Sequence, residues 1–403
     1  GGQDRGRRPG MSAARDPYFH SMEAALRDAG VAGPTLVIDL ARLDANLERI
    51  LTSVHLDMAV RVVAKSLPAP GLLRRVVSKL RATGLMSFNL PMTLQFCEAF
   101  PELDHMLGKP LNDAALRAFL AADVPGKDRV QWLADSVARL DEIEGAVAAA
   151  GARLRVALEI DVGLRRGGFD PGPDLRAGLE AIKASDRLIF SGLMGYEAHL
   201  ASVPEMFGWR ARAERESDSR YAAAASDVAA VLGDATLKSC VLNVGGSPTF
   251  RRYAEKRVVN EVALGSCVVK PSDFDKPGLA DLEPAAFIAA PILKSGPTRL
   301  PGFAATEGAY RMLNPSRSRS VFIHGGDWRA DPVDPPGLRY NGVFGRSPNQ
   351  EMLNGPASLV AETGDFVFFR PRKSESVFLQ FGPLAVLHDG RIDDWWPTVP
   401  LSA

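Results

Sequence analysis

The chain has 403 residues, enough for one large barrel and a smaller second domain. Its 48 basic and 48 acidic side chains cancel, so the totals give no sign of a nucleic-acid or anionic-membrane partner. No apolar run reaches the roughly 18 to 20 residues that a membrane span needs. The three cysteines are widely separated and form no CxxC pair, which favours a reducing compartment. We therefore expect a cytoplasmic protein.

Residues 1–10 resemble a leader, with Met11 as the natural start, and they lack the apolar core of a signal peptide. We expect residues 1–29 to hold this leader and a first helix. Short apolar runs then alternate with amphipathic stretches from about residue 41 to 265. The expected helices are 43–52, 72–81, 92–100, 113–122, 137–150, 175–184 and 206–232, and the expected strands are 58–65, 84–89, 105–109, 130–135, 154–161, 188–196, 239–245 and 260–265.

Eight strand and helix units at this spacing predict an α/β fold of the (β/α)8 (TIM) barrel type over residues 30–265. After residue 266 prolines and glycines become dense, and short β-rich runs predict a mostly antiparallel β domain over 266–403. Its expected strands are 285–293, 359–362, 365–370 and 376–381. The segment 34–39 precedes the first barrel helix and is a candidate strand of that second domain.

Lys65 closes an apolar strand-like run that a turn follows at once. A strand buried on both faces leaves its lysine little access to water, so the ammonium must be paired, deprotonated or used covalently. Buried amines with lowered pKa values are the nucleophiles of Schiff-base chemistry. On position alone a lysine that caps a strand at the surface is the simpler reading. The features further along the chain favour the chemical one.

Several polar groups follow the other expected strands, where the functional side chains of such barrels lie. Asn89 and Lys109 follow the second and third strands, and the segments 161–168 and 195–199 follow the fifth and sixth. The seventh strand ends in a Gly-Gly-Ser-Pro-Thr sequence, residues 245–249. Glycines allow close backbone approach to an anion and hydroxyls add donors, so at this position the sequence predicts a phosphate cradle instead of a plain turn.

An amine and a phosphate cradle on one rim describe a site for pyridoxal 5'-phosphate (PLP). Here the chain resembles the fold-type III PLP enzymes, which share the alanine racemase N-terminal barrel, and among them the D-threonine aldolase and D-serine dehydratase group. The resemblance covers about residues 30–270 well and the C-terminal domain loosely. The matching residues are Pro34 to Asp39 with Asn46, Ala64-Lys65, Glu159 to Gly163 with Arg166 and Gly168, Gly195-Tyr196 with His199, Val244 to Thr249, and Glu261 with Gly265-Ser266.

The resemblance implies a PLP enzyme in which Lys65 forms the Schiff base and Tyr196 and His199 are candidate catalytic groups. The implied cofactor-binding residues are Lys65, Arg166, Tyr196, Gly245, Gly246, Ser247 and Thr249. It also implies an amino-acid substrate, of D configuration in that group, and a homodimer with the active site near the interface. No nucleic acid or membrane partner is expected.

Two departures from the group stand out. It has a histidine two residues before the lysine and Thr-His-Lys after it, where this chain has Val63 and then Ser-Leu-Pro, residues 66–68. It also binds a divalent metal through a histidine paired with Cys or Asp near the C-terminus, where this chain has Lys373-Ser374-Glu375. We expect no metal, with Lys373 or Arg372 supplying the positive charge in its place. A solvated basic turn is the alternative, and His324 with Asp327 is a less favoured metal or base pair.

The long polar loop 340–351 is unlike core sequence, and long structured loops often serve binding sites. Arg346, Asn349 and Gln350 are therefore candidate substrate contacts. The predicted function is a PLP-dependent lyase acting at Cα or Cβ of an amino acid, by aldol cleavage or dehydration of a β-hydroxy D-amino acid. The alternatives are an amino-acid racemase without metal, a non-catalytic PLP carrier and a PLP-free Schiff-base aldolase. Substrate identity and stereochemistry stay open at this stage.

Overall fold

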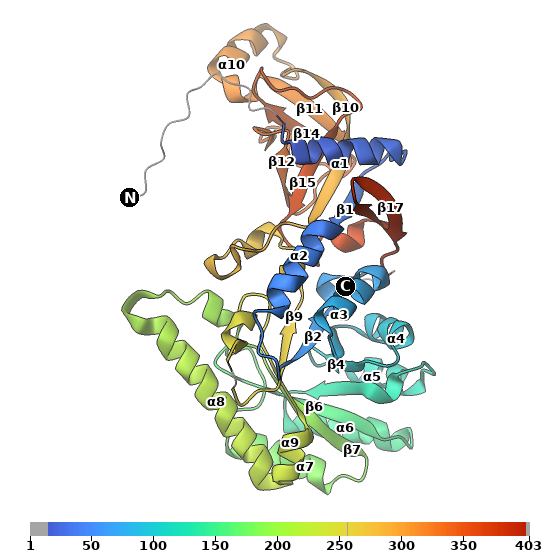
Figure 1. The fold of residues 1–403 in the computed structure, drawn as a ribbon, viewed down its shortest axis with the longest axis vertical. Helices are drawn as coiled ribbons and strands as arrows, with labels where there is room; N and C mark the ends of the chain where they lie inside the picture. Colours follow the sequence, from blue (N-terminus) through green and yellow to red (C-terminus); the bar gives the residue numbers. More distant parts are fainter. Residues whose placement is uncertain (1–14, 256, 400–403) are drawn as a thin grey trace. The chain divides into compact units, whose positions relative to one another are not determined.

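The computed structural model describes residues 15–255 and 257–399 (Figure 1), so the leader and Met11 lie outside the described residues. The described chain divides into two compact units. The barrel unit holds residues 44–268 and 274–282. The β unit holds the chain up to Leu43 together with 269–273 and 283–398.

The barrel unit is built on eight parallel strands that close on themselves, each hydrogen-bonded to the next and the last to the first. The (β/α)8 prediction is therefore confirmed, and with it the mostly antiparallel second unit described below. The barrel strands are β2 (Ala59–Val63), β3 (Gly84–Ser87), β4 (Asp104–Leu107), β5 (Val130–Ala134), β6 (Leu154–Ile160), β7 (Leu188–Gly195), β8 (Val241–Val244) and β9 (Glu261–Leu264). Nearly every residue of these strands is buried, as strands covered on both faces require.

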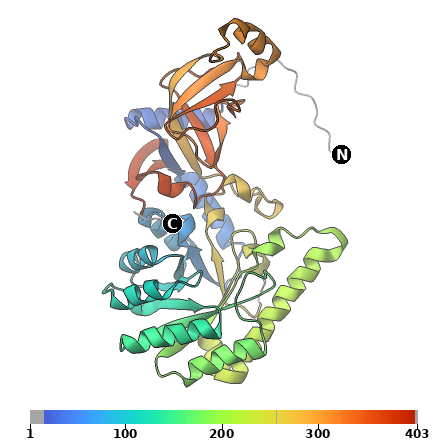
Figure 2. The ribbon, with the colours of Figure 1, turned by 180° about the vertical axis from the view of Figure 1, so that it is seen from behind.

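The helices of this unit lie outside the strands (Figures 1 and 2). They are α2 (Leu40–Leu51), which starts in the β unit, and α3 (Pro70–Leu80), α4 (Leu90–Ala99), α5 (Asp113–Ala121), α6 (Val137–Ala149), α7 (Pro173–Ala184), α8 (Trp209–Leu232) and α9 (Asp234–Ser239). Their starts follow ordinary capping rules. Asn89, which the sequence placed among the rim groups, caps α4 by accepting a 2.8 Å hydrogen bond from the Met92 N–H.

A fully buried arginine occupies the N-terminal half of the barrel. Arg61 is the one charged residue of β2, and all five of its N–H groups donate hydrogen bonds. Two go to Glu261 at 2.6 and 2.9 Å, and one to the Asp104 carboxylate at 2.7 Å. Asp104 also accepts from Arg155 at 2.7 Å. We call Arg61, Asp104, Arg155 and Glu261 the ion core.

The β unit is a mostly antiparallel sheet whose central path runs β13-β14-β11-β10-β1-β16-β17, with β15 pairing β10 and β12. Its strands are β1 (Thr35–Asp39), β10 (Ala286–Pro297), β11 (Arg319–His324), β12 (Ala330–Asp334), β13 (Arg339–Tyr340), β14 (Gln350–Gly355), β15 (Phe366–Pro371), β16 (Leu384–His388) and β17 (Arg391–Trp396). The segment 34–39 supplies β1, which pairs antiparallel with β10 and parallel with β16. Helix α1 (Pro17–Asp28) packs Phe19 and Met22 into the core of this unit.

Two predicted strands of the β unit are wrong. Residues 359–362 form no strand, because Pro356 and Gly364 impose turns on both sides and the Leu359 N–H bonds back to Pro356. Residues 376–381 contain a 3-10 turn, Phe378–Gln380, instead. There the Phe378 N–H bonds back to the Ser374 carbonyl. The sequence analysis also did not predict α9 or α10 (Glu307–Leu313).

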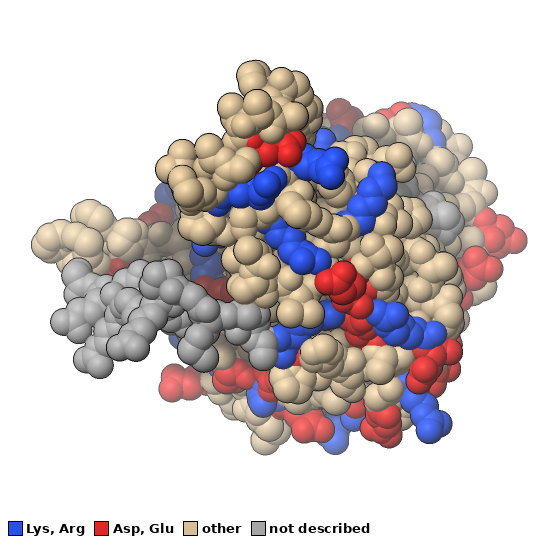
Figure 3. All heavy atoms as spheres, turned by 90° about the horizontal axis from the view of Figure 1, so that it is seen from above, with Lys and Arg blue, Asp and Glu red and all other residues tan. Residues whose placement is uncertain are grey.

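The surface fits the balanced composition. On the face shown in Figure 3, Lys and Arg side chains are interspersed with Asp and Glu, without a field of one sign. None of the helices in the described ranges is both long enough and apolar enough to cross a bilayer.

Candidate active site at the carboxyl ends of the barrel strands

Lys65 lies just beyond the carboxyl end of β2, in a short 3-10 turn, Ala64–Ser66. The sequence placed it at the last position of the strand, and the turn moves it two residues past Val63. Its side chain is half-buried, and its Nζ lies 4.3 Å from the centroid of the Phe88 ring, which follows β3. The amine therefore lies at the rim, against an aromatic face.

The segment 245–249 after β8, here called the anion loop, has the properties of an anion-binding turn. Gly245 has a φ of +92°, a conformation that favours glycine. Gly246 and Ser247 are buried, yet within the described residues their backbone N–H groups donate no hydrogen bond. A Cβ added to Gly246 would lie 2.8 Å from Cε2 of Tyr196. Two buried N–H groups without acceptors suit an oxyanion, so the loop fits the phosphate of PLP.

The anion loop is connected to the Lys65 turn through the segment after β9. The Ser247 Oγ accepts hydrogen bonds from the N–H groups of Gly265 and Cys267, both at 3.1 Å. Ser266 Oγ lies 2.9 Å from Ser66 Oγ. Position 265 also requires glycine, because a Cβ there would lie 2.9 Å from the Val63 carbonyl oxygen. These contacts place the amine and the anion loop on one rim.

Arg166 and Tyr196, two predicted cofactor-binding residues, lie together. The Arg166 Cζ lies 5.0 Å from the centroid of the Tyr196 ring, within cation–π range. Its Nη2 lies 3.5 Å from Oε1 of Glu159, at the end of β6. Burial raises the pKa of Glu159, although Arg166 acts in the opposite direction. The half-exposed Arg166 thus keeps a positive charge at the rim, beside the ring that covers Gly246.

His199 lies in the short turn after β7, near the segment that follows β6. A Cβ on Gly163 would lie 3.3 Å from its Nε2, and its Nδ1 is buried without a hydrogen-bond partner in the described chain. Burial lowers the pKa of His199, against the opposing effect of Asp161 and Glu216. The ring is therefore neutral at neutral pH, the form in which an imidazole accepts a proton.

Asp161 shapes the segment that carries Arg166. Its Oδ1 accepts hydrogen bonds from the N–H groups of Gly163 at 2.9 Å and Arg165 at 3.0 Å. Burial opposes its charge, but these hydrogen bonds with the cations Arg220 and Arg165 outweigh it and lower the pKa of Asp161. Asp161 is therefore an ionised carboxylate at neutral pH.

The remaining predicted residues belong to the β unit. Lys373 is exposed, after β15. Arg346 is engaged inside the unit, since it ion-pairs with Glu351 and lies over the Tyr340 ring at 3.7 Å. Asn349 is exposed.

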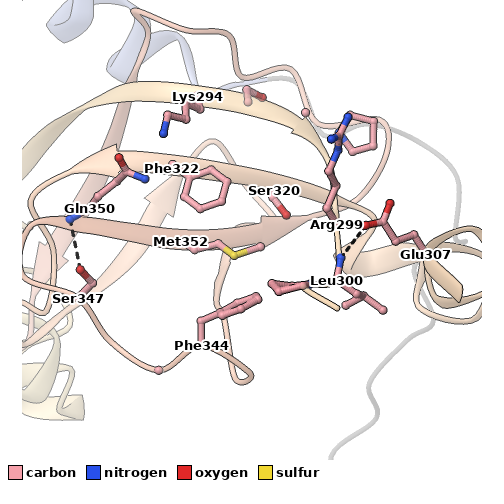
Figure 4. Close-up of a pocket in the computed structure, with 15 residues that line it drawn as sticks. Lys294, Arg299, Leu300, Glu307, Ser320, Phe322, Phe344, Ser347, Gln350 and Met352 are labelled. Carbon is pink, nitrogen blue, oxygen red and sulfur yellow. Dashed lines mark hydrogen bonds between the residues drawn. The ribbon is translucent and has the colours of Figure 1, made fainter. Parts of the chain in front are cut away.

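Gln350 lines an open cavity of about 750 Å³ on the sheet formed by β10, β11 and β14 (Figure 4). Phe322 and Met352 form its apolar floor, and Phe344 and Leu300 close one side. The structure thus separates the three proposed substrate contacts, with Arg346 bound internally, Asn349 in solvent and Gln350 in this cavity.

Other titratable groups do not form an alternative centre. In the described ranges no group of three or more His, Cys, Asp or Glu side chains could hold a metal ion. All three cysteines are buried thiols, and burial raises the pKa of Cys267 to about 11.

The sequence analysis missed the buried carboxylic acid Glu197 and gave no role to Arg61. The signal for Arg61 was present, because it is the one charge within an otherwise apolar strand.

Comparison with known proteins identifies the family to which the barrel is similar. Residues 38–273, more than half of the chain, match the family described as alanine racemase, N-terminal domain. The chain is 24% identical over 374 residues to a D-threonine aldolase from Arthrobacter sp, covering 91% of this chain and 92% of that protein.

Solved structures share the fold. A D-threonine aldolase from Filomicrobium marinum superposes with a TM-score of 0.67 at 20% identity, covering 92% of this chain and 95% of that one. For the D-threo-3-hydroxyaspartate dehydratase from Delftia sp. HT23 the TM-score is 0.69 at 18% identity, with 91% and 97% covered. An alanine racemase of Clostridium difficile 630 gives 0.68 at 14% identity, with 91% and 98% covered. The closed barrel, the lysine after β2 and the matched segment together show that the chain belongs to the alanine racemase N-terminal domain family, as its resemblance to fold-type III PLP enzymes indicated.

Proposed function

We propose that this protein is a PLP-dependent enzyme that acts at Cα or Cβ of an amino acid, with a β-hydroxy D-amino acid as substrate. The observation that carries the proposal is the continuous set of contacts between the Lys65 turn and the anion loop. One end offers an amine and the other two buried N–H donors, which are the two attachment points that PLP needs. The named activities of the relatives, aldol cleavage and dehydration, supply the reaction classes.

When bound, PLP supplies an aldehyde that condenses with amines and a ring that withdraws electrons from Cα. The residues of this chain hold the two ends. Lys65 would provide the amine for covalent attachment, while the N–H groups of Gly246 and Ser247 would donate to the phosphate. Tyr196 packs on the anion loop, and Arg166 keeps a positive charge beside it.

Proton transfer is assigned to His199 and Lys65. Burial lowers the pKa of His199, so its ring would accept a proton from the substrate hydroxyl in a retro-aldol reaction. Lys65 would be the candidate base on one face of the bound cofactor. A racemase needs a second base on the opposite face of the cofactor. Because His199 could be that base, a racemase remains the second candidate function.

The positive charge that assists the departing hydroxyl is assigned to Lys373. Lys373→Ala should then lower kcat more than it weakens PLP binding. A homodimer with the active site near its interface completes the proposal, and light scattering of the purified protein measures the assembly.

The deciding experiment uses borohydride reduction. The purified protein with PLP should absorb near about 420 nm, and reduction should fix the pyridoxyl group on the peptide that contains Lys65. Lys65→Ala should be colourless and inactive, and labelling of another lysine would overturn the assignment.

The reaction is then read from a panel of D- and L-amino acids, with and without EDTA. Glycine and acetaldehyde from D-threonine indicate aldol cleavage, whereas pyruvate and ammonia from D-serine indicate dehydration. Enantiomer formation without cleavage would replace the lyase with a racemase.

A further inference from the structure

Glu197 lies between two residues with proposed roles, Tyr196 and His199, but its own side chain is entirely buried. It follows β7 and reaches the segment after β8. The proposed chemistry does not use it. A carboxyl group without exposure is costly to retain, so its contacts decide what it does.

The contacts of Glu197 join two points of the segment 245–253. Its Oε2 accepts a hydrogen bond from the Gly245 N–H at 3.1 Å, and its Oε1 accepts one from the Tyr253 hydroxyl at 3.0 Å. The Thr249 hydroxyl, which donates to the Gly246 carbonyl at 3.5 Å, acts to lower the pKa of the same carboxyl group. One side chain therefore holds both the first residue of the anion loop and the 3-10 turn that follows the loop, Phe250–Tyr253.

This arrangement determines which donors of the loop remain for a ligand. The Gly245 N–H is committed to Glu197, whereas the next two N–H groups have no acceptor in the described chain. Gly245 also carries the positive φ of the turn. The carboxyl group thus holds the turn through Gly245, while the N–H groups of Gly246 and Ser247 remain available to a ligand.

Burial and the groups around Glu197 act on the proton affinity of its carboxyl group in opposite directions. Burial raises the pKa of Glu197, while the hydrogen bonds from Thr249 and Tyr253 and the charge of Arg252 act in the opposite direction. Arg252 donates to the Tyr253 hydroxyl at 3.3 Å and to Asp218 at 3.1 Å. The other facing group is the buried hydroxyl of Tyr221 on α8. A phosphate in the anion loop would add negative charge nearby and favour the protonated carboxyl further.

We propose that Glu197 is the positioning residue of the anion loop and that its carboxyl group takes up a proton when a phosphate group binds there. The inference rests on the proposed function only for the identity of the phosphate as that of PLP. Glutamine imitates the protonated form, because its amide can still accept from the loop and donate to Thr249.

The test measures dissociation constants of the cofactor-free full chain for PLP and for pyridoxal, which lacks the phosphate, between pH 6 and 9. Glu197→Ala should weaken PLP binding about tenfold or more, the scale of one or two lost hydrogen bonds, and leave pyridoxal unchanged. Glu197→Gln should stay within about threefold of the wild type, on the same hydrogen-bond scale. Titration calorimetry in buffers of different ionisation enthalpy should show less proton uptake for Glu197→Gln than for the wild type.

Two further variants separate positioning from general stability. Tyr253→Phe removes one partner of Glu197 and should weaken PLP binding. Tyr340→Phe is the matched control, because the Tyr340 hydroxyl donates to the Ala330 carbonyl inside the β unit, and it should lower the unfolding temperature without changing PLP affinity. Two results would overturn this inference alone. One is an affinity for PLP that is the same in Glu197→Ala, Glu197→Gln and the wild type. The other is proton uptake on PLP binding that is the same in the wild type and in Glu197→Gln. A wild-type chain that binds no PLP would overturn the proposed function as well.

Discussion

The two ends of the barrel solve the problem of buried polar groups in opposite ways. In the N-terminal half, every N–H of Arg61 has an acceptor and its cation contacts two carboxylates. At the carboxyl end, buried N–H groups of the anion loop lack acceptors in the described chain. A satisfied network stabilises the fold, whereas unsatisfied donors cost stability unless a ligand arrives. The comparison therefore assigns stability to one end and binding to the other.

The electrostatics of the ion core agree with this division. Burial opposes the charge of Arg61, but Glu261 and Asp104 outweigh it and raise its pKa. Burial likewise opposes the charge of Asp104, and Arg61 with Arg155 outweighs it and lowers its pKa. Each charge in the ion core offsets the desolvation cost of its neighbours. Loss of one charge therefore leaves the others buried without a counter-charge, which is destabilising.

The largest expected effect follows from Arg61→Met. Removal of the cation leaves Glu261 and Asp104 buried without it, and breaking such a pair costs about 3 to 5 kcal/mol of unfolding free energy. Urea denaturation followed by circular dichroism measures the loss. Arg117→Gln, in an exposed pair with Asp113, is the control and should cost less than about 1 kcal/mol. Similar losses in the two variants would contradict a special role for the ion core.

The second prediction tests the other end. Gly246→Val should weaken PLP binding about 10- to 100-fold, since the new side chain meets the Tyr196 ring and overpacking of this kind costs about 1 to 3 kcal/mol. Fluorescence titration of the cofactor-free protein gives the affinity. Gly278→Val meets no atom within 4 Å and should bind normally. Unchanged PLP affinity in a folded Gly246→Val protein would mean that the anion loop is a plain turn that does not bind phosphate.

The ion core could be foreseen only in part from the sequence. A lone arginine in the apolar run 58–65 indicates a buried charge, but its partners come from β4 and β9, far away in the chain. The barrel itself was predictable because each strand and helix leaves a local periodic pattern. The C-terminal strands were less so. The buried residues Val377, Phe378 and Phe381 lie in and beside the 3-10 turn Phe378–Gln380, and their spacing over six residues does not differ clearly from that of a strand.

For the site, the strand-end rule located Lys65 and the anion loop because parallel strands of a closed barrel end on one rim. The rule gives no information about what lies behind the loop. Glu197 was missed for that reason, since its role depends on the loop after a different strand. Arg346 illustrates the reverse problem, as its partner Glu351 lies five residues away and only the folded loop shows that they pair.

A smaller effect is expected at Asp161, on the segment that carries Arg166. Because its pKa is lowered in the fold, its carboxylate contributes stability that is present above the ordinary value of 3.8 and is lost as the pH falls through the lowered pKa. Asp161→Asn should cost about 1 kcal/mol at pH 7, the net scale of one hydrogen bond, and nothing at the acid end. Thermal unfolding across pH checks this against the exposed Asp186→Asn. A difference that persists in acid would point to packing instead of charge.

The smallest expected effect is that of chelation. At the position aligned with the metal pair of the related group this chain has Lys373-Ser374-Glu375, and one carboxylate is too few ligands for a catalytic divalent site. Turnover should therefore be unchanged after exhaustive dialysis against EDTA. Loss of activity that manganese restores would show that the alignment is wrong, and His324 with Asp327 would become the leading ligands.

Strand β1 has a consequence for the order in which the chain folds. It is made early in synthesis, yet it pairs with β10 and, through Val37 and Ala385, with β16 near the end of the chain. All eight barrel strands lie between these partners in the sequence. On the ribosome the barrel can close first, while both edges of β1 remain unpaired until β10 and then β16 have been synthesised. A stop codon before residue 384 should therefore leave β1 paired with β10 but with its β16 edge unpaired and prone to aggregation.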